Sequence, residues 1–150
     1  MTKPVATVIG PDGGEKFHVG PLAIRTLITR EQAGGAFEMH EVALGEGTVD
    51  YHVHHLMDET IHVIEGTIEF TVEGKVSREG PGGVAFIPKG LHHGFSNRGP
   101  APAKVIITFS PATGQDDYFR ALESLLAEGY STGVEALQKK YDQELVPLPA

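Results

Sequence analysis

The chain has 150 residues, a net charge of −8 and no cysteine. A length of this order fits one domain, and an acidic surface without clusters of Lys and Arg argues against nucleic acid and anionic membranes as partners. No apolar stretch approaches the roughly 20 residues that span a bilayer, and the N-terminus lacks the pattern of a signal peptide, so we expect a cytoplasmic protein.

The first twenty residues are rich in Gly and Pro and predict a loop with at most a short edge strand. Beyond them, short segments with β-branched residues and alternating apolar positions are separated by turn signals such as Gly45 and Gly66. Such a series of short strands is typical of an all-β barrel or sandwich. We expect strands over residues 22–29, 36–44, 48–54, 60–64, 67–72, 84–87, 91–96 and 104–109.

The pattern changes after residue 111. Residues 116–128 have the spacing of an amphipathic helix, whose apolar face is formed by Phe119, Leu122, Leu125 and Leu126. We expect Asp116 or Asp117 to cap its N-terminus, and Gly129 follows its end. A second, weaker helical pattern covers residues 133–145. We place no domain boundary and expect one domain, with a barrel over about residues 20–110 and a helical extension over about 115–145.

Six of the eight histidines lie between residues 52 and 93. His52 and His54 are two positions apart in a predicted strand, so their side chains point to the same face and can share a metal ion. Glu59 opens the next strand after a short loop, and His92 and His93 follow a later strand and a tight turn. Without thiolates, three imidazoles and one carboxylate suit Zn, Fe, Ni, Mn, Co or Cu better than Ca.

These residues resemble the first motif of the cupin superfamily, a His-x-His pair followed by a Glu and then a Gly. In this chain four residues separate His54 from Glu59, and six separate Glu59 from Gly66. Four residues stand between Gly47 and His52 where the family usually has five, and this difference leaves the ligand spacing intact. A second cupin motif is matched throughout, by Gly82, Pro88, Gly90, His93 and Asn97.

The resemblance selects His93 rather than His92 as the fourth ligand. It implies a jelly-roll barrel, hence an all-β cupin fold with one or two C-terminal helices. It also implies one divalent transition metal per chain, held by His52, His54, Glu59 and His93. A homodimer is expected because cupin barrels commonly pair through edge strands.

Two residues are candidates for catalysis. Glu59 can loosen its hold on a metal and act as a base. His40 faces the barrel interior if Val42 and Leu44 do, where it would carry protons or support a ligand; an exposed polar position is the alternative. His55, His62 and His92 are expected to point away from the site. Several large side chains wall a cavity or simply fill the core: Tyr51, Met57, Phe70, Phe86, Phe95 and Phe109.

Three functions are compatible with such a site. The first is a dioxygenase acting on a small phenolic, enolic or dicarbonyl compound, because a site of three His and one Glu resembles that of quercetinase-type cupins. The C-terminal segment, in which Ser110 and Pro111 lead to Tyr118 and Phe119, also resembles small bacterial cupins related to quercetin dioxygenase. The second is a non-oxidative cyclase, isomerase or dehydratase, similar to polyketide cyclases, with the metal as Lewis acid. The third is a non-enzymatic module that binds a small molecule.

Overall fold

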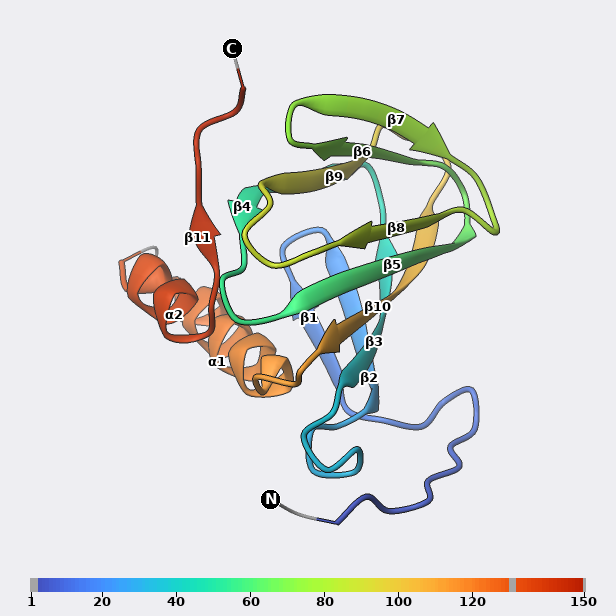
Figure 1. The fold of residues 1–150 in the computed structure, drawn as a ribbon, viewed down its shortest axis with the longest axis vertical. Coiled ribbons are helices and arrows are strands. Elements are labelled where there is room, and N and C mark those ends of the chain that lie inside the picture. The colour runs from blue at the N-terminus through green and yellow to red at the C-terminus, as the bar shows by residue number, and fades with distance from the viewer. Residues whose placement is uncertain (1–2, 130–131, 150) are drawn as a thin grey trace.

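The computed structural model describes residues 3–129 and 132–149. Within these residues, eleven strands form two antiparallel sheets that face each other (Figure 1). One sheet has the strand order β1-β2-β3-β10-β5-β8, and the other has the order β11-β4-β9-β6-β7. The strands are β1 (Lys16–Val19), β2 (Leu22–Ile28), β3 (Glu38–Leu44), β4 (Gly47–Val53), β5 (Asp58–Glu65), β6 (Ile68–Val72), β7 (Lys75–Glu79), β8 (Val84–Ile87), β9 (His93–Asn97), β10 (Ala103–Ser110) and β11 (Glu144–Leu145).

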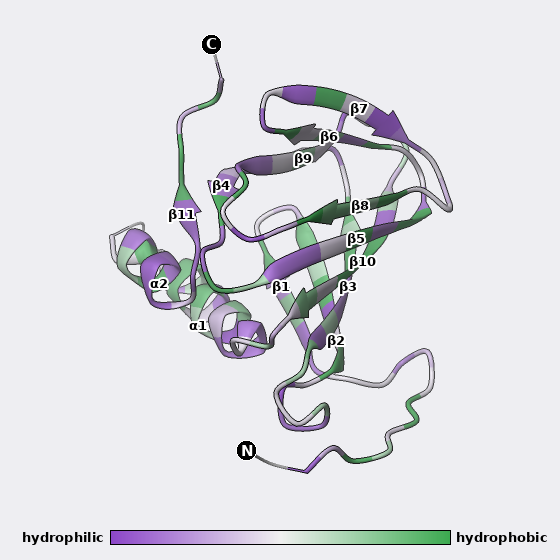
Figure 2. Cartoon of the chain, viewed as in Figure 1, coloured by the Kyte–Doolittle hydropathy of each residue, from purple (hydrophilic) through white to green (hydrophobic). Residues whose placement is uncertain are grey.

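The core lies between the two sheets because alternate residues of the central strands point inward. In β3 and β10 the side chains alternate strictly between buried and partly exposed, which puts Val42 and Leu44 inside together with Val105 and Phe109. Figure 2 shows this mixture of apolar and polar positions along the strands of the larger sheet. The predicted all-β barrel and its eight strands are confirmed, with shifts of one or two residues at most ends.

Two strands fall where the sequence predicted none. All five residues of β7 are exposed, and the strand is largely hydrophilic (Figure 2). It lies at the edge of its sheet, where a strand needs no buried face and so leaves no apolar alternation in the sequence. Strand β11 has two residues, which is too short for any periodic pattern.

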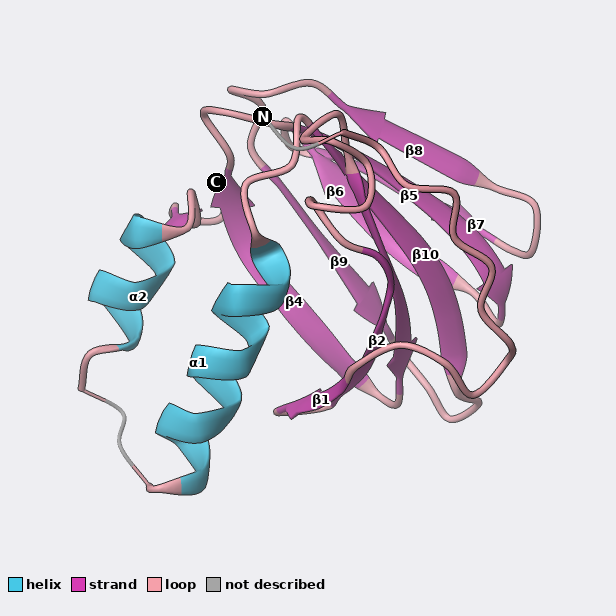
Figure 3. Cartoon of the chain, turned by 90° about the horizontal axis from the view of Figure 1, so that it is seen from below, coloured by secondary structure: helices cyan, strands magenta, loops and turns pink. Residues whose placement is uncertain are grey.

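Two helices follow β10. They are α1 (Gln115–Ala127) and α2 (Val134–Lys140), which lie side by side along one side of the barrel (Figure 3). Neither is long and apolar enough to cross a membrane, and no other helix of the described residues is. Tyr118 and Leu122 of α1 are buried against the barrel. The second predicted helix is present but ends at Lys140, before the chain extends into β11.

The predicted cap of α1 by Asp116 or Asp117 is wrong. The N-cap residue is Gly114, in a left-handed conformation with φ of 87°, and no side chain of its own caps the helix. The carboxylate of Glu38, on β3, accepts hydrogen bonds from the amides of Gly114 (2.9 Å) and Gln115 (2.7 Å). An acidic residue far away in the sequence therefore satisfies the free amides at the N-terminus of α1, as a local cap would, and fixes the helix to the barrel.

Candidate metal centre

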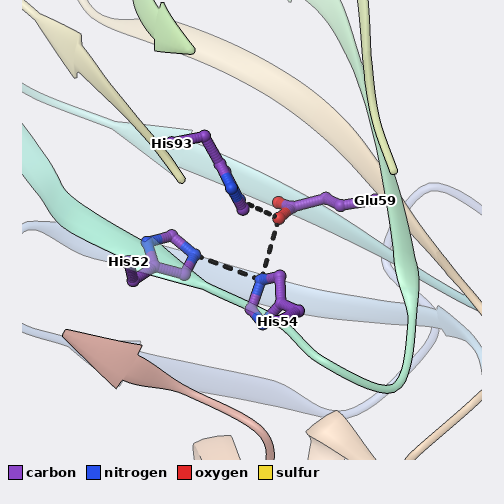
Figure 4. A group of neighbouring side chains, drawn as sticks. All are labelled: His52, His54, Glu59 and His93. Carbon is purple, nitrogen blue, oxygen red and sulfur yellow. Dashed lines mark hydrogen bonds and ion pairs between the residues drawn. The ribbon is translucent and has the colours of Figure 1, made fainter. Parts of the chain in front are cut away.

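Both sheets contribute to the predicted cluster. His52, near the end of β4, and His93, the first residue of β9, are cross-strand partners in the smaller sheet. His54 follows β4 directly, and Glu59 is the second residue of β5 in the larger sheet. All four side chains are buried and converge on one point between the sheets (Figure 4). The structure thus brings together the four residues that the sequence singled out.

The polar atoms of the cluster lie close enough to share one ion. Oε1 of Glu59 is 2.7 Å from Nε2 of His93 and 3.0 Å from Nε2 of His54. Nε2 of His52 is 3.1 Å from Nε2 of His54. One ligand atom from each of the four residues lies within 4.8 Å of the other three. Ligand atoms that bond to one ion at about 2.1 Å lie at distances of this order from one another.

Hydrogen bonds set the tautomer of all three imidazoles. Each Nδ1 contacts a backbone carbonyl oxygen: Asp50 for His52 (2.6 Å), Asp142 for His54 (2.7 Å) and Leu91 for His93 (3.0 Å). Because a carbonyl oxygen only accepts, each Nδ1 carries a proton. In a neutral imidazole, Nε2 then directs a lone pair at the other ligands, whereas an imidazole that is also protonated at Nε2 donates there to Glu59. Such a set repels itself unless protons or one shared cation lie at its centre, and this is the donor arrangement of a metal site.

The pKa values show how these groups divide charge when no metal is bound. Burial, helped by the neighbouring His93 and His54, lowers the pKa of His52 to about 3, so this imidazole is neutral. Burial alone would raise the pKa of Glu59, but its hydrogen bonds to His54 and His93 outweigh burial and hold the pKa below its usual value. The pKa of His54 is raised, because its hydrogen bond to Glu59 outweighs the opposing effect of burial. Positive charge at the cluster is therefore stabilised by an ionised Glu59.

A cavity of about 250 Å³ opens onto His52, His54 and Glu59. Its walls come from both sheets and from helix α1, and they are almost wholly apolar or aromatic. Outside the cluster, the lining side chains with polar atoms are Thr48, Tyr118 and Gln143, and no Lys or Arg is among the described residues that line it. The main apolar and aromatic lining residues are Val19, Leu22, Ile24, Val42, Val49, Phe95, Ile107, Phe109, Phe119, Leu122 and Leu126.

His40 faces the interior, which was one of the two positions expected from the sequence, but it is not among the residues that line the cavity. Its Nδ1 is 3.1 Å from the hydroxyl of Thr26, and its Nε2 is 2.8 Å from Oε1 of Glu38. The ring of Phe109 lies between the two sites, 6.0 Å from the His40 ring and 5.7 Å from the His54 ring. Both ring nitrogens of His40 thus have partners that link β2 and β3, and its catalytic role stays a prediction.

Of the other predicted side-chain positions, some are confirmed and one is wrong. His55 and His62 are exposed as expected, and His92 is half-buried with its ring edge against Tyr51. Phe95 and Phe109 line the cavity, but Phe86 is 61% exposed on edge strand β8 and walls nothing. Sequence reasoning missed Gln143, which reaches the cavity from the turn after α2; the local sequence carries no signal for it.

Two facing antiparallel sheets that enclose three histidines and a glutamate define a jelly-roll protein with a candidate metal site. Residues 38–109 match the family model described as "Cupin domain". The residues that match this cupin domain run from β3 through β10 and include the whole candidate site.

One relative and two solved structures show what else the chain is similar to. "Tetracenomycin polyketide synthase protein TcmJ" of Streptomyces glaucescens is 33% identical over 90 residues, which cover 58% of this chain and 60% of that protein. The structure of KdgF from Halomonas sp. has a TM-score of 0.64 at 20% identity, covering 71% of this chain and 94% of that one. The polyketide cyclase RemF from Streptomyces resistomycificus has a TM-score of 0.62 at 20% identity, covering 71% and 80%. At such identities the structures show the fold alone, and none of these comparisons specifically supports the resemblance to quercetin dioxygenase.

Proposed function

We propose that this protein is a metal-dependent enzyme that cyclises a small enolisable polycarbonyl compound without using oxygen. The observation that carries the proposal is a cavity with largely apolar walls and no Lys or Arg among its described lining residues, which opens onto three residues of the candidate metal site. The similarity to TcmJ, named as a polyketide synthase protein, supports the same chemistry. This changes the order of the functions expected from the sequence, in which the dioxygenase came first.

The lining of the cavity favours a neutral, largely apolar substrate. A phosphate or carboxylate group needs a cationic partner or several polar donors when it is buried, and the described lining residues include no Lys or Arg. Aromatic side chains such as Phe95, Phe109 and Phe119 suit flat, conjugated molecules. At about 250 Å³, the cavity is near the lower end of the size range of small-molecule pockets, about 300 Å³. A compound of one or two rings therefore fits these walls best.

The chemistry follows from the metal-site residues that line the cavity. A bound divalent ion supplies Lewis acidity, which polarises a carbonyl group and makes the adjacent C–H more acidic. Glu59 is held ionised and accepts a proton from the terminal carbon of the substrate, next to a carbonyl. That carbon then bonds to the carbonyl carbon at the other end of the same molecule and closes a six-membered ring. The new alkoxide takes up a proton and leaves as water together with a ring hydrogen, which makes the ring aromatic. The apolar walls hold the chain folded on itself and keep bulk water out.

The proposal predicts turnover under argon. The zinc-loaded protein, incubated with a phenyl-substituted linear triketone, should yield a resorcinol that is lighter than the substrate by one water. Mass spectrometry of the product and an oxygen electrode make the measurement, and equal rates in argon and in air are expected. Product that contains oxygen from O₂, or oxygen uptake equal to product formed, would instead establish a dioxygenase. Tight binding of the triketone without product would leave a binding module.

Within this proposal, Glu59→Gln is expected to lower the rate of cyclisation by about 100-fold or more, because the amide cannot take a proton. The three imidazoles still provide ligands, so metal content should fall less than activity. Glu65→Gln, at the exposed far end of the same strand, is the matched control and should leave the rate unchanged. A Glu59→Gln protein that retains its metal and full activity would remove Glu59 from the mechanism.

The homodimer and the cytoplasmic location expected from the sequence stay predictions. Metal identity belongs with them, because first-row metals compete for such sites by availability as much as by affinity.

A further inference from the structure

The segment after α2 returns to the candidate metal site, although it lies outside the residues that match the cupin domain. Residues 141–145, called the clasp below, include strand β11, which pairs with β4 so that Leu145 stands opposite His52. The amide of Val146 then donates to the carbonyl of Tyr51 (3.1 Å). Figure 1 shows β11 running beside β4. The clasp thus covers the edge of the strand that carries the first ligands.

Asp142 makes three hydrogen bonds to the loop that starts at His54. Its backbone carbonyl accepts the Nδ1 proton of His54 (2.7 Å). Its carboxylate accepts the amides of His55 (2.7 Å) and Leu56 (2.8 Å), one on each oxygen. The residue has a φ of 64°, a left-handed conformation that Asp and Asn tolerate better than most residues. This backbone turn and these two carboxylate bonds direct the carbonyl of Asp142 at the imidazole.

Gln115 holds the clasp from the other side. Its side chain is fully buried, and its Nε2 donates to the carbonyl of Tyr141 (2.8 Å) and to the hydroxyl of Thr113 (2.9 Å). Its Oε1 accepts a hydrogen bond from Nε2 of Gln143 (2.7 Å). The two residues on either side of Asp142 are thereby tied to the start of α1, which is itself tied to the barrel.

The three histidines differ in how their rings are oriented. The carbonyls that fix His52 and His93 belong to residues two positions earlier in the chain, so local structure supplies them. The carbonyl that fixes His54 is 88 residues away. A metal-ligating imidazole depends on the partner of its other nitrogen for orientation and basicity. His54 is therefore the one ligand of the three whose orientation depends on the clasp.

We propose that the clasp is a built part of the metal centre, in which Asp142 and Gln115 are positioning residues for His54. The inference rests on the metal site of the proposed function but not on the reaction. Its failure is therefore distinguishable: if the unmutated protein binds no metal, the proposed function fails, whereas equal binding by the unmutated and clasp variants contradicts the clasp alone.

The test is the affinity of the full-length protein for Zn²⁺, measured by calorimetry, and the visible absorption of the Co²⁺-loaded protein, which reports ligand geometry. Asp142→Ala is expected to weaken the affinity by about 10–100-fold and to change the Co²⁺ spectrum. Asp142→Asn keeps the left-handed preference and one acceptor oxygen, so it should restore part of the affinity. Glu135→Ala, an exposed change on α2 of the same extension, should leave affinity and spectrum unchanged.

A folded Asp142→Ala protein whose Zn²⁺ affinity is within twofold of the unmutated value, with the same Co²⁺ spectrum, would overturn the inference. Circular dichroism of the metal-free variant establishes that it is folded. If Asp142→Ala does not fold, the NMR signal of the His54 Nδ1 proton in the unmutated, metal-free protein decides. Slow exchange of this proton with solvent supports the clasp, and exchange as fast as that of a free imidazole contradicts it.

Discussion

Replacing His93 by alanine is expected to lower the bound metal to less than about one tenth of an ion per chain. Losing a hydrogen-bond partner of a ligand already weakens metal affinity by about 10–100-fold, and losing the ligand itself weakens it more. The Nε2 of His93 is the atom closest to Oε1 of Glu59, at 2.7 Å, and its ring is 4.3 Å from that of His52. Removing it opens the site and leaves two imidazoles and a carboxylate. Elemental analysis of the purified variant makes the measurement.

The neighbouring His92 provides the matched control. Its ring packs edge-on against Tyr51, 6.0 Å away, and is not part of the cluster. His92→Ala should therefore keep the metal content of the unmutated protein. If both variants lose metal equally, or if His93→Ala retains its metal, the ligand set is wrong.

Glu38→Ala is expected to lower the free energy of unfolding by about 3–5 kcal/mol. The substitution removes a buried carboxylate and leaves its buried hydrogen-bonding partners in place. The carboxylate is fully buried, contacts His40 at 2.8 Å and accepts the amides of Thr113, Gly114 and Gln115. All of these groups would be left without that acceptor. Since the total stability of such a domain is about 5–15 kcal/mol, urea denaturation will detect the loss readily.

Glu41→Ala, three positions after Glu38 and on the opposite face of β3, is the control. Its carboxylate pairs with Arg25 at 3.2 Å near the surface, so the loss of unfolding free energy should be about 1 kcal/mol or less.

The stabilisation by Glu38 also depends on pH. Burial would raise the pKa of Glu38, but its hydrogen bond to His40 and its amide donors outweigh burial and lower the pKa. Its contribution is thus fully present above the ordinary pKa of 4.5 and is lost as the pH falls below it. Equal losses in the two variants would refute this role of Glu38.

The barrel strands and the four-residue cluster were predictable because their signals are local. Alternation along residues 38–44 shows which side chains point inward, and the distance of two positions between His52 and His54 places both imidazoles on one side. The choice of His93 over His92 came from the spacing of the second motif, and the structure puts His93 in the cluster.

The support of the site was not predictable, because it depends on contacts between residues far apart in the sequence. Glu38 replaces the local cap expected for α1 from a position 76 residues before Gly114. Asp142 reaches His54 across 88 residues, and its own neighbourhood contains no ligand-like pattern. Only the path of the chain back along β4 brings that carbonyl to the imidazole. Long-range hydrogen bonds of this kind leave no periodicity for sequence reasoning to find.

The central claim is that His52, His54, Glu59 and His93 together hold one divalent metal ion. Elemental analysis of the unmutated protein, produced with ample Fe, Ni, Mn, Zn, Co and Cu and purified without chelators, tests it most directly. A total of about one transition-metal ion per chain is predicted. Protein that is folded by circular dichroism and yet carries no transition metal above the buffer background would contradict the claim.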